Sequence, residues 1–292
     1  MNIKPGKTRV GFIGLGVMGK SMAGHILKAG YEVHVYTRTK KTAEELVSNG
    51  ALWEESVRSL GKKTDVIITM VGYPSDVEQV YLGDDGILAH AGQSSLVIDM
   101  TTSSPDLAVK IYEKAVSLKI DALDAPVSGG DLGARNATLS IMVGGDKPAF
   151  DRALPLFEIM GKNIVLQGKS GSGQHTKMAN QIAIAAGMVA VCESIAYAKR
   201  AGLDPETVLK SIGAGAAASW SLNNLGPRMI AGNFEPGFYV KHFIKDMKIA
   251  AESSERLGLK APGLALALSL YEKLSRTGCE NDGTQALFKL FE

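Results

Sequence analysis

The stretch Arg9–Met22 reads RVGFIGLGVMGKSM and places Gly14, Gly16 and Gly19 in the spacing G-x-G-x-x-G. An apolar run precedes the glycines and an amphipathic segment follows them, as at a turn between a strand and a helix. In that position the spacing is typical of a loop that binds the pyrophosphate of a dinucleotide. The first glycine allows a tight turn, the second admits the phosphates, and the third lets helix and strand pack closely. The residues between the glycines are Leu15, Val17 and Met18. An ordinary strand–helix turn is the alternative.

Short apolar runs and amphipathic stretches alternate through the first half of the chain. This alternation predicts βαβ units and a mostly parallel sheet, and therefore the α/β class. The expected strands are Arg9–Ile13, Glu32–Tyr36, Asp65–Val71, Leu96–Asp99, Ala122–Asp124, Leu139–Gly144 and Asn163–Leu166. Expected helices include Met18–Ala29, Lys41–Asn49 and Pro105–Ser117.

The second half of the sequence has a helical character. The alanine-rich run Gln174–Ala201 predicts one long helix, and Asp204 followed by Pro205 predicts the start of the next. Loops are expected around Gly226–Pro227 and Glu235–Gly237. We therefore expect a dinucleotide-binding domain over residues 1–168, and a long linking helix with a helical domain over residues 169–292.

The composition is that of a globular protein and limits its partners. The 292 residues are 45% hydrophobic and carry a net charge of +2, so we expect no nucleic-acid partner. Two cysteines, Cys192 and Cys279, are too few for a disulfide framework and favour a cytoplasmic location. The N-terminus does not resemble a signal peptide. The apolar segment Ile182–Cys192 is too short to cross a bilayer, so we expect a core helix and no membrane partner. The histidines form no metal-ligand pattern, and we expect no metal.

The residues after the second expected strand bear on the choice of cofactor. An NAD-binding enzyme usually has an acidic residue there, which holds the ribose 2′-hydroxyl. This chain has Thr37, Arg38 and Thr39, followed by two lysines. Arg38 could pair with a 2′-phosphate, which favours NADP over NAD. Two alternatives stay open: a solvated basic patch, or an arginine that stacks on the adenine and tolerates NAD.

Four motifs occur in a characteristic order: GFIGLGVMG, DAPVSGG, SGSGQHTKMANQ and KDMKIA. Along essentially its whole length the chain resembles the β-hydroxyacid dehydrogenase family. That family includes 3-hydroxyisobutyrate dehydrogenases, tartronate semialdehyde reductases and glyoxylate/succinic semialdehyde reductases. The resemblance implies an α/β fold with an N-terminal Rossmann-type doubly wound sheet, a long inter-domain helix and an all-helical C-terminal domain. It also implies a homo-oligomer, a dimer or a tetramer.

The resemblance places the family's catalytic lysine at Lys177. Hydride transfer to or from a carbon that bears oxygen requires that oxygen to lose or gain a proton. A lysine can serve when burial and neighbouring charge lower its pKa from about 10.4. His175 is the rival acid–base group, but two residues along a helix it points to another face. An exposed surface lysine is the bland alternative.

The resemblance also implies a set of binding residues. Ser128, Gly129 and Gly130 of DAPVSGG would bind a substrate carboxylate, for which uncovered amides form a suitable anion nest; a plain tight turn is the alternative. Asn180 and Gln181 would face the substrate beside Lys177, although Gln181 stands where the family commonly has a second asparagine. Phe238 and Asp246 are expected at the substrate pocket, Thr102 near the nicotinamide ribose and Lys245 beside the cofactor. A core aromatic, a strand-end cap and an ordinary ion pair are the alternative interpretations.

These observations predict an NAD(P)-dependent oxidoreductase of a small 3-hydroxy acid or semialdehyde acid, similar to 3-hydroxyisobutyrate dehydrogenase. A glyoxylate/succinic or tartronate semialdehyde reductase is the alternative. Imine reduction is known on this architecture but usually without the lysine, and 6-phosphogluconate dehydrogenase has a much larger helical domain. A non-catalytic dinucleotide sensor or scaffold is a further alternative, which the presence of Lys177 and the SGG motif disfavours.

Overall fold

The structure is a computed structural model that describes residues 3–292; the first two residues of the N-terminal segment lie outside the described part. The chain divides into two compact units, Met1–Lys177 and Met178–Glu292, which we call the sheet unit and the helical unit. The division falls inside the long helix α9, Ser172–Arg200. Gln174 and Lys177, in the first turns of this helix, are hydrogen-bonded to residues of the sheet, so these turns belong to the sheet unit. The expected boundary after residue 168 coincides with the end of the last strand.

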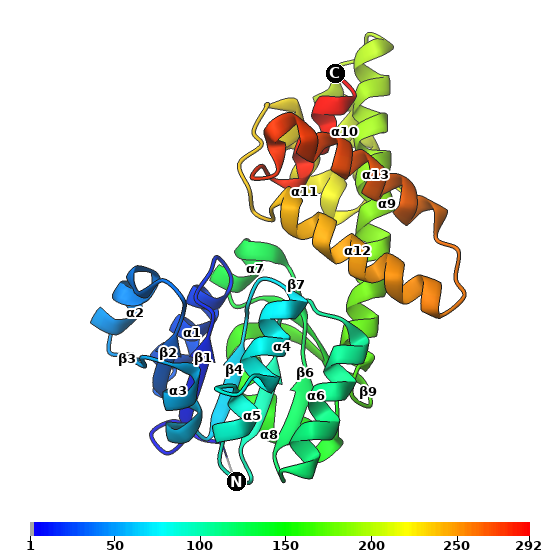
Figure 1. Ribbon diagram of the computed structural model, residues 1–292. Coiled ribbons are helices and arrows are strands. Elements are labelled where there is room, and N and C mark those ends of the chain that lie inside the picture. The colour runs from blue at the N-terminus through cyan, green and yellow to red at the C-terminus, as the bar shows by residue number, and fades with distance from the viewer. Residues whose placement is uncertain (1–2) are drawn as a thin grey trace. The chain divides into compact units, whose positions relative to one another are not determined.

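The sheet unit is built on a nine-stranded sheet within the described residues (Figure 1). Its strands are β1 Arg9–Ile13, β2 Glu32–Tyr36, β3 Leu52–Trp53, β4 Val66–Thr69, β5 Leu96–Asp99, β6 Asp121–Asp124, β7 Val127–Ser128, β8 Leu139–Gly144 and β9 Gly161–Gly168. The first six are parallel in the order β3-β2-β1-β4-β5-β6, which is the Rossmann order. The short β7 and the neighbouring β6 pair with β8 in the antiparallel direction, and β9 pairs with β8 in parallel. The predicted α/β fold class and doubly wound sheet are confirmed.

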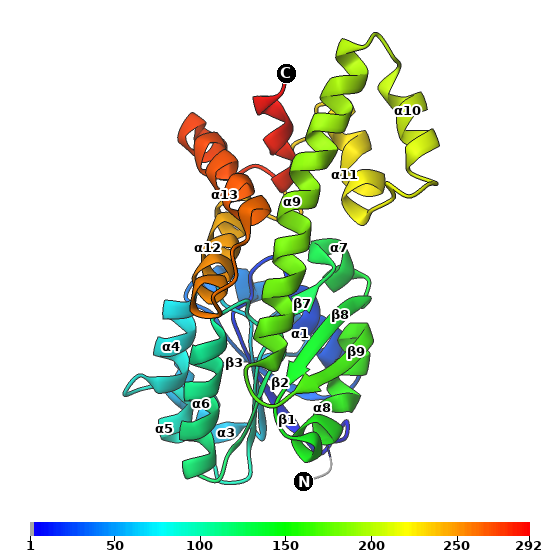
Figure 2. The same ribbon diagram turned by 90° about the vertical axis from the view of Figure 1, so that its right-hand side faces the viewer.

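Helices cover both faces of this sheet (Figure 2). The sheet unit contains α1 Gly19–Lys28, a 3-10 turn at Lys40–Ala43, α2 Glu44–Ser48, α3 Val57–Lys63, α4 Pro74–Leu82, α5 Ile87–His90, α6 Pro105–Ser117, α7 Gly130–Arg135 and α8 Lys147–Met160. Apolar side chains of α1 and α8 pack on one face, and those of α3, α4, α5 and α6 pack on the other. The central strands are therefore buried on both faces, which explains their continuous apolar runs in the sequence.

The helical unit packs around the long helix α9, Ser172–Arg200. Its other helices are α10 Pro205–Ile212, α11 Trp220–Ile230, α12 Val240–Arg256 and α13 Pro262–Leu274, followed by a π-helical turn at Ser275–Cys279 and a 3-10 helix at Thr284–Leu290. By length and composition alone α9 could cross a membrane, but half of its most apolar window is buried. Its buried side chains, which include Met188 and Cys192, belong to the core of the helical unit. The prediction of a core helix is confirmed.

Most boundaries predicted in the second half agree with the structure, with one clear error. Asp204 caps α10 by accepting a hydrogen bond from the Thr207 amide at 3.0 Å, and residues 235–237 lie in a loop. The loop expected at Gly226–Pro227 is wrong, because both residues lie inside α11. A Cβ at Gly226 would lie 3.1 Å from the Leu209 side chain, so this glycine serves close packing between α11 and α10 instead of a turn.

Candidate functional site

The glycine-rich turn joins β1 to α1 with the geometry that a bound dinucleotide requires. Gly14 has a φ of +95°, and a Cβ there would lie 2.2 Å from the Met70 carbonyl oxygen. A Cβ at Gly19 would lie 2.0 Å from the Gly14 carbonyl oxygen, so only glycine allows helix and turn to approach this closely. Gly16 is different: a Cβ there would meet nothing within 4 Å.

The turn therefore has open space beside Gly16, next to the first turn of α1. The first amides of any helix lack partners inside the helix and suit phosphate oxygens. Leu15 is buried and anchors the turn, whereas Val17 is exposed and Met18 half-buried. These residues fit the pyrophosphate of a dinucleotide.

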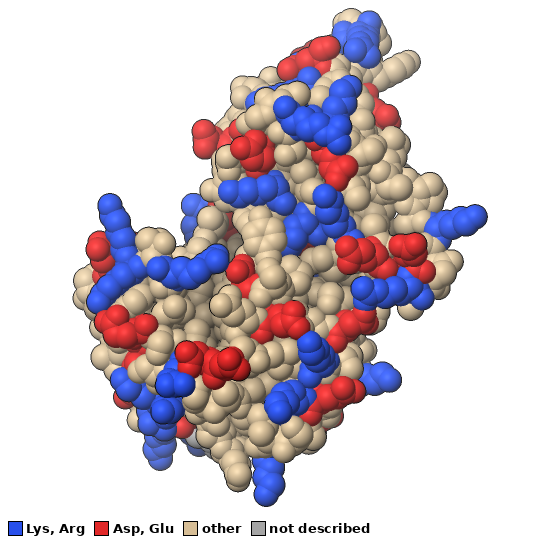
Figure 3. All heavy atoms as spheres, in the orientation of Figure 1, with Lys and Arg blue, Asp and Glu red and all other residues tan. Residues whose placement is uncertain are grey.

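The turn after β2 carries the residues expected to distinguish the two cofactors. Thr37 is half-buried and Thr39 is exposed, while the Arg38 side chain is 81% exposed. Arg38 Nη1 donates a hydrogen bond to Asp76 Oδ1 of α4 at 3.2 Å. Figure 3 shows Lys and Arg side chains around α1 and α2, with Asp and Glu side chains beside them. Arg38 thus follows β2 at the position where NAD-binding enzymes usually carry an acidic residue, and it already has an acidic neighbour.

Buried polar groups brace the start of α9 against the ends of β5 and β6. The Asp124 carboxylate accepts hydrogen bonds from the Gly171 amide at 2.8 Å and the Gln174 amide at 2.9 Å. The Gln174 side chain accepts from the Ser103 amide at 3.0 Å and donates to the Thr101 carbonyl at 2.7 Å. The beginning of α9 is therefore fixed from two sides. Thr102 lies half-buried in this segment, between residues that hold the helix.

Lys177 and the SGG segment are neighbours inside the sheet unit. Lys177 is only 6% exposed, and its Nζ donates a hydrogen bond to the Val127 carbonyl oxygen at 2.8 Å. Val127 directly precedes Ser128, Gly129 and Gly130, and these two glycines have φ angles of +125° and +61°. Residues with side chains rarely adopt such backbone angles, and a turn of this kind is a suitable place for backbone amides that bind an anion. His175 is exposed, in contrast to Lys177.

The expected site residues of the helical unit form one connected polar chain. Asn180 Nδ2 donates to Gln181 Oε1 at 2.7 Å, and Gln181 Nε2 donates to Asp246 Oδ2 at 2.6 Å. The second oxygen of Asp246 lies 2.8 Å from Lys245 Nζ. Gln181 and Asp246 are buried, so the longer amide at position 181 is anchored on α12.

Phe238 contacts the apolar core of the helical unit. Its ring packs on Phe243, with the ring centroids 5.6 Å apart. Phe238 itself is half-buried, whereas Phe243 is fully buried. The structure thus presents Phe238 as the edge of the helical unit's core, which is compatible with both interpretations given for it.

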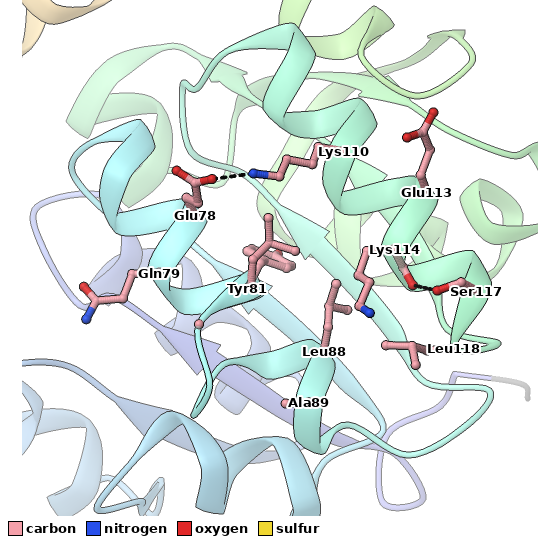
Figure 4. Close-up of a pocket in the computed structure, with 12 residues that line it drawn as sticks. Glu78, Gln79, Tyr81, Leu88, Ala89, Lys110, Glu113, Lys114, Ser117 and Leu118 are labelled. Atoms are coloured by element: carbon pink, nitrogen blue, oxygen red, sulfur yellow. Dashed lines mark hydrogen bonds and ion pairs between the residues drawn. The ribbon is translucent and has the colours of Figure 1, made fainter.

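A groove of about 930 Å³ lies elsewhere on the sheet unit, among α4, α5 and α6 (Figure 4). Its walls carry Glu78 and Lys110, which form an ion pair at 2.6 Å, and apolar residues such as Leu88. It contains neither the glycine turn nor Lys177. Residues 3–292 also contain no group of three or more His, Cys, Asp or Glu side chains that could hold a metal ion.

Three residues of the site escaped the sequence reasoning: Asp76, Asp124 and Gln174. Asp124 and Gln174 stand inside the quoted motifs DAPVSGG and SGSGQHTKMANQ, so a signal was present. The hydrogen bonds of Asp124 join two segments about fifty residues apart in the sequence, and a sequence motif does not show that these segments meet. Asp76 lies in no motif, and its approach to Arg38 follows only from the pairing of the strands.

Comparison with known proteins gives consistent matches over nearly the whole chain. Residues 9–168 match the family model described as the NAD binding domain of 6-phosphogluconate dehydrogenase. Residues 171–291 match the family model described as NAD-binding of NADP-dependent 3-hydroxyisobutyrate dehydrogenase. The chain is 63% identical to the uncharacterised oxidoreductase YkwC of Bacillus subtilis, with 98% of this chain and 99% of that one covered.

Two further proteins have named activities. The chain is 40% identical to the 2-hydroxy-3-oxopropionate reductase of Escherichia coli K12, with 97% of each chain covered. The solved structure of Mycobacterium tuberculosis 3-hydroxyisobutyrate dehydrogenase with L-serine superimposes with a TM-score of 0.90 at 29% identity. That match covers 98% of this chain and 99% of the other.

Proposed function

Since this chain belongs to the β-hydroxyacid dehydrogenase family and is an NAD(P)-dependent dehydrogenase of a hydroxy acid, we propose that its substrate pair is 3-hydroxyisobutyrate and methylmalonate semialdehyde. We further propose that NADP is the preferred cofactor and that Lys177 is the general acid–base. A tartronate semialdehyde or glyoxylate/succinic semialdehyde reductase is the second candidate, because the 2-hydroxy-3-oxopropionate reductase relative is 40% identical.

One observation carries the proposed role of Lys177. Its Nζ is buried and bonded to the carbonyl of Val127, the residue that precedes the SGG segment. An ammonium or amine held at that point lies beside the proposed carboxylate nest, and a substrate anchored by its carboxylate would present its β-oxygen within the same region. An exposed surface lysine, the bland alternative, does not have this burial.

The proposed chemistry divides between the cofactor and the residues of this chain. When bound, the nicotinamide accepts or supplies the hydride. In the oxidation, the Lys177 amine takes the proton from the substrate hydroxyl group; in the reduction, its ammonium gives a proton to the carbonyl oxygen. Ser128 and the amides of Gly129 and Gly130 hold the substrate carboxylate. The turn at Gly14–Gly19 holds the pyrophosphate, and Thr102 lies toward the nicotinamide ribose.

The helical unit supplies an ordered set of amides. Asp246 is bonded to Gln181 and paired with Lys245, so the Gln181 side chain has one fixed direction. Gln181 in turn accepts from Asn180 Nδ2 and fixes that amide. We propose that Asn180 contacts the substrate and that Gln181 and Asp246 position it. Lys245 would contribute beside the cofactor and Phe238 at the apolar side of the pocket.

Assembly and location stay predictions. A homo-oligomer agrees with the unburied α10 and with the exposed apolar side chains of the helical unit, which include Tyr197, Leu203 and Trp220. A cytoplasmic location rests on the low cysteine content.

A substrate panel tests the proposal. Methylmalonate semialdehyde, tartronate semialdehyde, succinic semialdehyde and glyoxylate would each be assayed with NADPH and NADH, and 3-hydroxyisobutyrate and L-serine with the oxidised cofactors. We expect the highest kcat/KM for methylmalonate semialdehyde with NADPH. A higher value for tartronate semialdehyde would establish the second candidate. Lys177→Ala should lose activity toward every substrate that the wild type accepts; selective loss toward one would contradict the acid–base role.

A further inference from the structure

Arg38, whose guanidinium is proposed to bind the 2′-phosphate of the cofactor, forms an ion pair with the carboxylate of Asp76 on α4. Arg38 Nη1 lies 3.2 Å from Asp76 Oδ1. The arginine side chain is 81% exposed, whereas the Asp76 side chain is 19% exposed. The aspartate is therefore the more buried partner of this pair, and the arginine is the more exposed one.

The position of Asp76 has a local cause. Asp76 is the third residue of α4, and its Oδ2 accepts a hydrogen bond from the Tyr73 amide at 3.1 Å in a capping box. One carboxylate oxygen thus holds the helix start and the other faces Arg38. An asparagine could keep the acceptor for the Tyr73 amide while losing the negative charge.

We propose that Asp76 sets the cofactor preference by competing with the 2′-phosphate of NADP for Arg38. The inference rests on the proposed role of Arg38 in reading that phosphate. NAD carries no charge at the 2′-position, so its binding does not require Arg38 to leave Asp76. The Asp76 carboxylate would therefore make the preference for NADP over NAD smaller than it would be if Arg38 had no acidic partner.

The electrostatics of the site support a measurable effect. A phosphate bonded to Arg38 would lie within roughly 8 Å of the Asp76 carboxylate, which is inside the Debye length of about 10 Å at 0.1 M salt. Two neighbouring cations have acidic partners of their own: Lys40 pairs with Glu55 at 3.3 Å and Lys20 with Glu45. An exposed ion pair contributes at most about 1 kcal/mol, so competition by Asp76 should change selectivity by a moderate factor instead of abolishing binding.

The test compares Asp76→Asn with Glu78→Gln in the full-length enzyme. Glu78 lies on the same helix and pairs with Lys110, so Glu78→Gln removes one negative charge without touching Arg38. We would measure dissociation constants for NADP⁺ and NAD⁺, and for adenosine 2′,5′-bisphosphate and 5′-AMP as fragments. Asp76→Asn should raise the preference for the 2′-phosphorylated member of each pair about two- to fivefold. The gain should shrink as salt rises from 0.1 to 1 M, and Glu78→Gln should match the wild type.

The same set of variants separates the inference from the proposed function. Arg38→Ala should weaken NADP⁺ more than NAD⁺; equal losses would overturn the proposed role of Arg38 itself. If Arg38→Ala is selective but Asp76→Asn leaves the ratio at the Glu78→Gln value, only the competition is overturned. In an Arg38→Ala background, Asp76→Asn should change the ratio by less than about twofold, because no shared guanidinium remains. An equal gain in both backgrounds would contradict competition for Arg38.

Discussion

Asp99 and Asp124 occupy paired positions at the carboxyl ends of β5 and β6, and both side chains are buried. Burial raises the pKa of each carboxyl group to about 6, and the charge of Asp124 adds to the increase at Asp99. Asp99 Oδ1 accepts from Thr69 Oγ1 at 2.8 Å and from the Thr101 amide at 3.0 Å. These carboxyl groups hold the segments that lead to Thr102 and Lys177, so their protonation is linked to the stability of the sheet unit.

Asp99→Asn should remove the free-energy cost of burying an ionised carboxylate at neutral pH. A carboxyl group whose folded pKa is raised binds more protons in the folded than in the unfolded protein, so stability falls as pH rises from about 4 through about 6. The asparagine carbonyl can keep both hydrogen bonds and does not ionise. The free energy of unfolding of the variant, relative to wild type, should therefore increase by about 1–3 kcal/mol between pH 4.5 and pH 8. Urea denaturation at a series of pH values measures this difference. Parallel pH profiles for the two proteins would show that the pKa of Asp99 is the same in the folded and the unfolded protein, and would contradict the raised pKa.

Lys177→Ala should lower kcat by about 10²–10⁴-fold, the usual loss for a positioned acid–base group. The variant should still bind cofactor, because Lys177 is bonded to Val127 and not to the glycine turn. Lys177→Arg should not restore activity, since a guanidinium does not release its proton at working pH. His175→Ala is the matched control: its side chain is exposed, and most activity should remain. Steady-state kinetics and cofactor titration decide the matter. A Lys177→Ala enzyme within a few-fold of wild type, or an inactive His175→Ala enzyme, would refute the assignment.

Much of the fold was predictable because its signals are local. The strands β1, β2, β5 and β8 have the predicted bounds, since each is a short apolar run ended by turn residues. The error at Gly226–Pro227 shows the limit of such signals. Both residues usually end helices, but a Cβ at Gly226 would lie only 3.1 Å from the Leu209 side chain, a close approach that exists only after the helices pack. Tertiary packing therefore overrode the local propensity.

The sequence motifs select candidate site residues, but they do not show how these residues are connected in space. The motifs named Lys177, Ser128 and the glycines, but the bond from Lys177 to Val127 and the bracing by Asp124 depend on strands brought together in space. The pair of Arg38 and Asp76 joins residues on the ends of different βα units. Contacts of this kind follow from the order of strands in the sheet, which sequence periodicity does not specify.

Two glycines of the turn, Gly14 and Gly16, should separate the effect on folding from the effect on cofactor binding. Gly14→Ala should destabilise the protein by about 2 kcal/mol or more, because φ is +95° and a Cβ would lie 2.2 Å from the Met70 carbonyl oxygen. Gly16→Ala should change the free energy of unfolding by less than about 1 kcal/mol, because its Cβ meets nothing within 4 Å. It should nevertheless weaken cofactor binding about tenfold or more, since the second glycine admits the pyrophosphate. Thermal denaturation and cofactor titration measure the two effects. Wild-type affinity in Gly16→Ala would mean that the phosphates bind elsewhere.

The nest at Ser128–Gly130 should be sensitive to both its hydroxyl group and its backbone. Ser128→Ala should raise the KM for a carboxylate substrate, because it removes one donor. Gly129→Val should abolish turnover: φ at Gly129 is +125°, which a β-branched residue rarely adopts, so the backbone amides would change direction. Cofactor affinity should change less than about threefold in both variants, because the glycine turn is separate from the nest.

Gly50→Val is the matched control for backbone strain, since Gly50 has a φ of +106°, is exposed and lies after α2. It should lower thermal stability as Gly129→Val does, yet keep the wild-type KM for the substrate. If Gly129→Val retains turnover, or if Gly50→Val raises the substrate KM to the same extent, then the SGG segment acts only as a turn and the carboxylate is bound by other residues.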